Sequence, residues 1–218
     1  MCDNAPTDPD VVAMFDRWRK NYDEATDEQQ REFYSRMFRE YPKQESYHLT
    51  SVIRFIEAIR DPYVFEFGGW DGQLAAETLY FCPNVEEWTN FDCCHQAVTS
   101  TAQRDHRYHP MPCEFNVWDT TREHFNTLVA AHSIEHIRQE QFHKLIDSLP
   151  DLEYVYIDSP LSAKTQNWHG YEGTHIYEAG WDKTIADLAE RGFVRVARWR
   201  TGTNMEQSTA YAFRRKLA

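Results

Sequence analysis

The chain has 218 residues, of which 41% are hydrophobic and 15% aromatic, and its formal net charge is −12 at pH 7. This length fits one sizeable domain with a packed core, and no apolar run approaches the ~20 residues that a membrane-spanning helix needs. The acidic balance argues against general affinity for nucleic acid or for an anionic membrane surface.

The first residues and the cysteines bear on the compartment in which the protein works. The stretch MCDNAPTDPD is acidic and polar, unlike an ordinary secretory signal. The five cysteines are an odd number and contain no C-x-x-C pair. We therefore expect a reduced, cytoplasmic protein without a zinc site, and no spacing of histidines and carboxylates indicates another metal.

Residues 1–60 predict an N-terminal helical extension. Apolar and aromatic side chains recur at helical spacing in three successive segments, the last of them spanning about residues 46–60. Asp61 and Pro62 end the third segment, because the residue before a proline disfavours helix. These helices either cover a sheet or form a lid over a ligand pocket, and the two roles are compatible.

Residues 63–81 form the unit around which the rest of the chain is organised. YVFEF predicts a buried strand, three glycines interrupt it, and the following run to Phe81 predicts a helix with Leu74, Thr78 and Phe81 on one side. Glycines at such a junction let the backbone approach a ligand closely. Because Glu66 adds a negative charge, the turn suits a cationic or hydroxyl-bearing cofactor better than a pyrophosphate, although a close-packed corner would look similar.

Further strands are predicted along the chain, each ending on a polar residue. They are residues 87–92 ending at Asp92, 113–119 ending at Asp119, 127–132 ending at His132, and 153–158 ending at Asp158. Strands that alternate with helical sequence predict a parallel sheet, and ligands bind beyond the carboxyl ends of its strands.

The last third of the chain predicts a long loop, a helix and a strand pair. Residues 161–179 show no periodicity and supply His169 and His175, and a helix follows that ends at Gly192. Residues 193–200 and 208–215 predict an antiparallel pair at one sheet edge. The basic residues there favour a solvated edge over a patch for an anionic substrate or partner.

This order of elements resembles the class I S-adenosylmethionine-dependent methyltransferases. FEFGGWDG is similar to their first motif: Glu66, Gly68 and Gly72 match it, and Trp70 stands where the commonest pattern has a glycine. The resemblance implies an α/β, Rossmann-like domain over residues 61–218. Its sheet would have seven mostly parallel strands, helices on both faces and an antiparallel last strand.

The resemblance also implies S-adenosyl-L-methionine as the cofactor. Asp92 would accept hydrogen bonds from the ribose hydroxyls, Trp118 and Asp119 would contact adenine, and carboxylates such as Glu66 would attract the positive sulfonium. The cofactor-binding set is Glu66, Phe67, Gly68, Gly69, Trp70, Gly72, Asp92, Trp118, Asp119 and His132.

The implied reaction is methyl transfer to an oxygen or nitrogen of a small molecule, such as a sugar or a natural-product intermediate. Enzymes position the two reactants for this displacement and add a base where the acceptor carries a proton. The candidates for that base are His132, His136, Asp158, His169 and His175. A noncatalytic binding or assembly protein of the same fold is the alternative, a nucleic-acid methyltransferase is disfavoured, and the sequence leaves a homodimer open.

Overall fold

The computed structural model describes residues 49–100, 105–112, 121–160, 177, 179–201 and 208–216. Of the predicted N-terminal extension, the described part contains one helix, α3 (Leu49–Glu57), which belongs to the third predicted segment. The first two helical segments lie outside the described residues.

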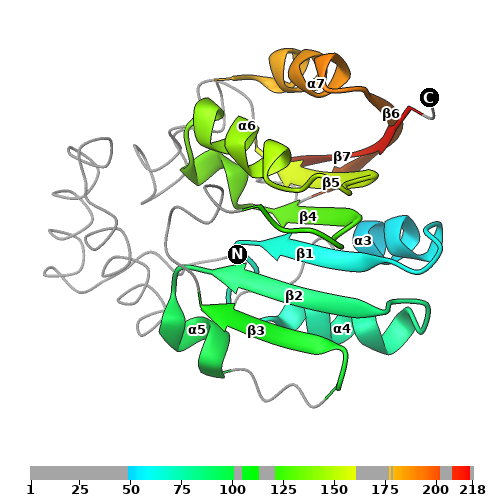
Figure 1. Cartoon of the computed structure of the whole chain (residues 1–218), viewed down its shortest axis with the longest axis vertical. Helices are drawn as coiled ribbons and strands as arrows, with labels where there is room; N and C mark the ends of the chain where they lie inside the picture. Colours follow the sequence, from blue (N-terminus) through cyan, green and yellow to red (C-terminus); the bar gives the residue numbers. More distant parts are fainter. Residues whose placement is uncertain are drawn as a thin grey trace, which may run out of the picture.

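Seven strands form one sheet in the order β3-β2-β1-β4-β5-β7-β6, which Figure 1 shows from β6 at the top to β3 at the bottom. The strands are β1 (Tyr63–Phe67), β2 (Glu87–Asp92), β3 (Tyr108–Pro112), β4 (Thr127–Ala131), β5 (Tyr154–Ser159), β6 (Phe193–Thr201) and β7 (Ser208–Arg215). The pairs among β1 to β5 are parallel, and β7 runs antiparallel to both β5 and β6. The predicted fold class is confirmed.

The helices cover both faces of this sheet. They are α4 (Gln73–Phe81), α5 (His95–Ser100), the 3₁₀ turn η3 (Ile134–His136), α6 (Gln139–Asp147) and α7 (Trp181–Glu190), together with α3. Successive strand residues point to opposite faces. Accordingly Phe65 packs in one core with Phe142 of α6, whereas Val64 packs in a second core with Val52 of α3 and Leu79 of α4.

The structure differs from the local expectations at two places. The third strand is β3, a stretch we did not predict as a strand, and the predicted strand at residues 113–119 lies outside the described residues. The sequence of β3 is YHPMP, whose two prolines are tolerated because it is an edge strand. Phe81, expected on the same side of its helix as Leu74 and Thr78, is 53% exposed, whereas those two residues are buried, because Phe81 lies in the last turn of α4.

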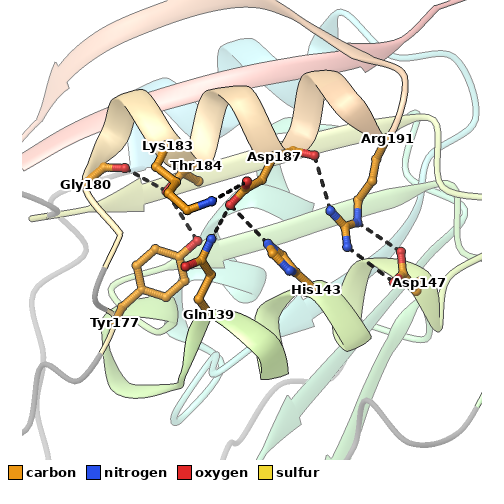
Figure 2. Close-up of polar contacts among 9 residues, drawn as sticks. All are labelled: Gln139, His143, Asp147, Tyr177, Gly180, Lys183, Thr184, Asp187 and Arg191. Atoms are coloured by element: carbon orange, nitrogen blue, oxygen red, sulfur yellow. Dashed lines mark hydrogen bonds and ion pairs between the residues drawn. The ribbon is translucent and has the colours of Figure 1, made fainter.

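A buried ionic contact joins α6 to α7 (Figure 2). Asp187 is 4% exposed and accepts hydrogen bonds from Lys183 at 2.9 Å, from His143 at 3.1 Å and from Gln139. Burial alone would raise the pKa of Asp187, but these hydrogen bonds together lower it. We call these four residues the Asp187 cluster; it fixes the two helices to each other on one face of the sheet.

Candidate functional site

The loop between β1 and α4 is bent so tightly that it needs glycine. Gly68 and Gly72 have positive φ angles of 72° and 73°, and the Gly68 N–H donates to the Phe91 carbonyl at 2.7 Å. A Cβ atom at Gly69 would lie 2.4 Å from the Glu66 carboxyl carbon. The backbone therefore rests directly on the side chains beneath it, and no larger residue fits at this point.

Buried polar side chains form the floor under this glycine loop. The Trp88 indole donates to Glu66 at 2.7 Å, and the Asn90 amide donates to the Tyr108 hydroxyl at 3.0 Å and to the Trp70 carbonyl at 3.2 Å. Glu66 and Asn90 are register partners on adjacent strands, so their side chains lie side by side. The floor thus couples β1, β2 and β3 to the loop above them.

Burial changes the charge that Glu66 carries. The side chain is 1% exposed, and desolvation, only partly offset by the Trp88 hydrogen bond, raises its pKa to about 8. The Oδ1 atom of Asn90 has no hydrogen-bond partner among the residues that the structure describes. At neutral pH Glu66 is therefore mostly protonated, and its predicted attraction for a sulfonium stays a prediction.

Asp92 ties the glycine loop to the end of β2. One carboxylate oxygen accepts the Trp70 N–H at 2.9 Å, and the other accepts the Cys94 N–H at 2.7 Å. Burial raises the pKa of Asp92 to about 6, so the group is mostly ionised at neutral pH. Each oxygen keeps a second lone pair, so the carboxylate can still accept hydrogen bonds from two hydroxyl groups of a ligand.

The end of β4 packs against the same loop. A Cβ atom at Gly68 would lie 2.5 Å from the Ser133 Cβ atom, which places His132 and Ser133 beside the turn. His132 has a positive φ of 50°, and its N–H donates to the Asp158 carbonyl at 2.7 Å. The structure thus brings His132 to the same sheet edge as the glycine loop and Asp92.

A carboxylate that the sequence analysis missed lies next to His132. The Glu135 Oε1 atom is 3.5 Å from His132 Nδ1, and its Oε2 atom accepts the Ser159 hydroxyl at 2.9 Å. Glu135 is only 2% exposed. The spacing of three residues between His132 and Glu135 in HSIEH is the signal that could have indicated this pair.

Phe67 is the buried last residue of β1. The other remaining predicted site residues fall into three groups. The Asp158 carboxylate is fully buried and accepts hydroxyls of Thr201 at 2.7 Å and Ser208 at 2.6 Å, so it holds the β6–β7 hairpin inside the core. His136 ends the η3 turn, half-buried. The predicted residues outside the described part of the chain are Trp118, Asp119, His169 and His175.

The described residues contain neither a helix that could span a membrane nor a cluster of metal ligands. No helix among them is long and apolar enough to cross a membrane. No group of three or more histidine, cysteine, aspartate or glutamate side chains in the same ranges is arranged to hold a metal ion.

Comparison with known proteins identifies the fold. No family model and no curated protein sequence matches the chain. Among solved structures, magnesium protoporphyrin IX methyltransferase from Synechocystis PCC 6803, solved with bound SAH, has a TM-score of 0.62 at 15% identity, covering 93% of this chain and 94% of that one.

Two further solved methyltransferase structures share this fold. The N-methyltransferase NodS from Bradyrhizobium japonicum WM9 has a TM-score of 0.60 at 18% identity, covering 77% of this chain and 94% of that one. The methyltransferase domain of bacterial CtHen1 has a TM-score of 0.59 at 12% identity, covering 78% of this chain and 98% of that one. Together with the strand order, these likenesses give the chain the fold of the class I S-adenosylmethionine-dependent methyltransferases.

Proposed function

We propose that this protein is an S-adenosylmethionine-dependent methyltransferase that acts on an oxygen or nitrogen of a small molecule, such as a sugar or a natural-product intermediate. The observation that carries the proposal is Asp92: an ionised, buried carboxylate that fastens the glycine loop at the carboxyl edge of the sheet. Two proteins of the same fold, magnesium protoporphyrin IX methyltransferase and NodS, were solved with SAH, the product of that cofactor.

The residues present fit an adenosyl group. Asp92 would accept the ribose hydroxyls, and the backbone of the glycine loop, which packs closely on the side chains beneath it, would lie against the ligand. Trp118 and Asp119 are proposed to contact adenine. The cofactor supplies an activated methyl group, and the chain's own residues would orient the acceptor and take up its proton.

Calorimetry with SAH tests this proposal. We expect binding by the wild-type protein and a higher melting temperature in its presence, because a ligand that binds only the folded state stabilises it. Asp92→Asn keeps the shape of the side chain but removes its charge, and the loss of a charged hydrogen bond should weaken SAH binding by about 10- to 100-fold.

Asp151→Asn is the matched control. Asp151 also accepts a backbone N–H, from His124 at 3.0 Å, but it precedes β5 at the amino end of that strand. Its substitution should leave SAH affinity unchanged. Absence of binding by the wild-type protein to both SAH and S-adenosylmethionine would overturn the proposal, and donor binding without transfer of label to a metabolite extract would favour a noncatalytic role.

A further inference from the structure

The strand β6 is an open edge of the sheet. Among the described residues it pairs with β7 alone, and Figure 1 shows it at the outer end of the sheet. β6 is nine residues long and contains no proline. The opposite edge, β3, has five residues, and its two prolines cannot donate backbone hydrogen bonds. Of the two edges, β6 is therefore the better able to pair with a further strand.

A β-bulge brings three arginines of β6 to one face of the sheet. The register between β6 and β7 shifts just after Arg195, which lies opposite Phe213, and Arg198 then lies opposite Tyr211. Residues three apart in a regular strand point to opposite faces, but the extra residue of the bulge puts both arginines on the face of Phe213 and Tyr211. Arg200, two residues after Arg198, shares this face by ordinary alternation.

Two of these arginines lie over the same aromatic ring. The guanidinium carbons of Arg195 and Arg198 are both 5.5 Å from the centre of the Tyr211 ring, which is 6% exposed and packs against Trp181 at 4.5 Å between ring centres. Neither arginine forms an ion pair within the ranges that the structure describes, although the chain has 35 acidic and 23 basic residues. Packing on the ring therefore positions two positive charges that no described carboxylate neutralises.

The charge of this edge contrasts with that of the chain. β6 contains three arginines, β7 contains two, and neither strand contains an acid, whereas the whole chain has a formal net charge of −12. Charge alone fits the solvated edge that the sequence predicts. However, Val194 and Val196, which flank Arg195, are 39% and 56% exposed and add apolar area that a partner can cover. Arginine and valine side chains along one open edge suit a segment with both acidic and apolar side chains.

We propose that β6 binds an extended acidic segment of another protein, which adds to the sheet as a further strand. The outward N–H and C=O groups of β6 would pair with the backbone of the segment, as in other cases of strand addition. Its aspartate or glutamate side chains would meet Arg195, Arg198 and Arg200. Three strands separate β6 from β1, so this surface is distinct from the glycine loop, and the inference goes beyond the proposed function.

Two other occupants fit this edge less well. A second copy of the chain, paired through its own β6, would place arginines beside arginines, and like charges on paired strands are destabilising. A nucleic acid would leave the outward backbone groups of β6 without a pairing strand, and the net charge of −12 would repel its phosphates. The same arginines therefore disfavour self-association and favour an acidic strand.

Calorimetry with a synthetic peptide tests the proposal. The probe is a capped peptide of alternating glutamate and valine residues, as long as β6. We expect the wild-type protein to bind it, and the double variant Arg195→Gln/Arg198→Gln to bind it about 10-fold more weakly. The matched control, Arg54→Gln/Arg60→Gln, removes the same charge from α3 and the turn after it, and it should keep the wild-type affinity. Equal losses in the two double variants would overturn the proposal, because they would indicate attraction by net charge alone.

A second peptide and hydrogen exchange separate strand pairing from charge attraction. The same peptide N-methylated at every residue keeps its carboxylates but has no backbone donors, so it should bind at least about 10-fold more weakly. In the full-length wild-type protein, the unmodified peptide should slow amide exchange in β6 and not in β3, a readout that holds even if the arginine variants fail to fold. Absence of binding, equal affinity for the methylated peptide or unchanged exchange in β6 would overturn the proposal. So would tighter binding of a single-stranded oligonucleotide, or exchange in β6 that slows with protein concentration alone, which would assign the edge to a second copy.

Discussion

Replacing Glu66 by glutamine should change how the stability of the protein depends on pH. Glutamine keeps an oxygen that accepts from the Trp88 indole and supplies amide hydrogens on the side of Asn90. The buried polar side chains under the glycine loop therefore keep their hydrogen-bond partners. In the wild type, burial raises the pKa of Glu66 from 4.5 to about 8. A carboxyl group with a raised pKa holds its proton more tightly in the folded state than in the unfolded state. Its contribution to the stability of the folded state is therefore complete below pH 4.5 and is lost as pH rises through 8.

The magnitude follows from the width of that window. Where Glu66 is protonated in the folded state and ionised in the unfolded state, the free energy of unfolding falls by about 1.4 kcal/mol for each pH unit. Between about pH 5 and pH 8 the total loss is therefore at most ~4 kcal/mol. For a chain of this size, 1 kcal/mol corresponds to roughly 2–4 °C in melting temperature. We therefore expect Glu66→Gln to gain stability over the wild type steadily across this range.

Urea unfolding at one-unit intervals from about pH 5 to pH 9, followed by circular dichroism, measures this difference. Glu77→Gln is the control, because Glu77 lies on the adjacent helix α4 and is only half-buried. Its curve should run parallel to that of the wild type. Parallel curves for the wild type and Glu66→Gln would refute the reasoning, since they would mean that Glu66 titrates alike in the folded and unfolded states.

Two other substitutions test the packing of the loop and of the helices. In denaturant unfolding, Gly72→Ala should destabilise the protein by at least about 2 kcal/mol more than Gly192→Ala. Both glycines have a positive φ, but only at Gly72 would an added Cβ atom clash, lying 2.1 Å from the Tyr108 hydroxyl oxygen. Tyr108→Phe should recover part of that loss, and equal losses at the two glycines would contradict the clash. Asp187→Asn should cost about 1–3 kcal/mol at neutral pH. Because the pKa of Asp187 is lowered on folding, the extra stability of the wild type over Asp187→Asn should disappear as pH falls below the ordinary pKa of 3.8. A stability difference that does not depend on pH would argue against an ionised Asp187.

Most of the fold could be predicted because its signals are local. The strand ending at Asp92 and the final antiparallel pair follow from runs of β-branched and aromatic residues between turn residues. The helix from Gln73 follows from good helix formers with side chains at helical spacing. The strand at Tyr108 was missed because local signals work against it: its prolines remove backbone donors, and only its place at the sheet edge makes them acceptable.

Only part of the candidate site could be predicted, because some of its residues are brought together only by strand register and packing. Glycines and the acid that ends β2 are visible in the sequence, and the structure brings them together. Asn90, Tyr108 and Glu135 were missed because their importance comes from register and packing. Asn90 is opposite Glu66 on the next strand, and Glu135 meets Ser159 from a strand more than twenty residues further along the chain.

The two acids at the glycine loop show why a sequence pattern alone does not give the electrostatics of a site. Glu66 and Asp92 look equivalent as acids near the ends of neighbouring strands, yet their pKa values rise to about 8 and about 6. At neutral pH Glu66 is mostly protonated under the loop and Asp92 is mostly ionised beside it, because two backbone N–H groups stabilise the ionised form of Asp92 only. An ionised Glu66 would repel the Asp92 carboxylate strongly, because the interior beneath the loop is poorly solvated. A protonated Glu66 removes this repulsion, so that Asp92 can carry the negative charge that faces a cationic, hydroxyl-bearing cofactor.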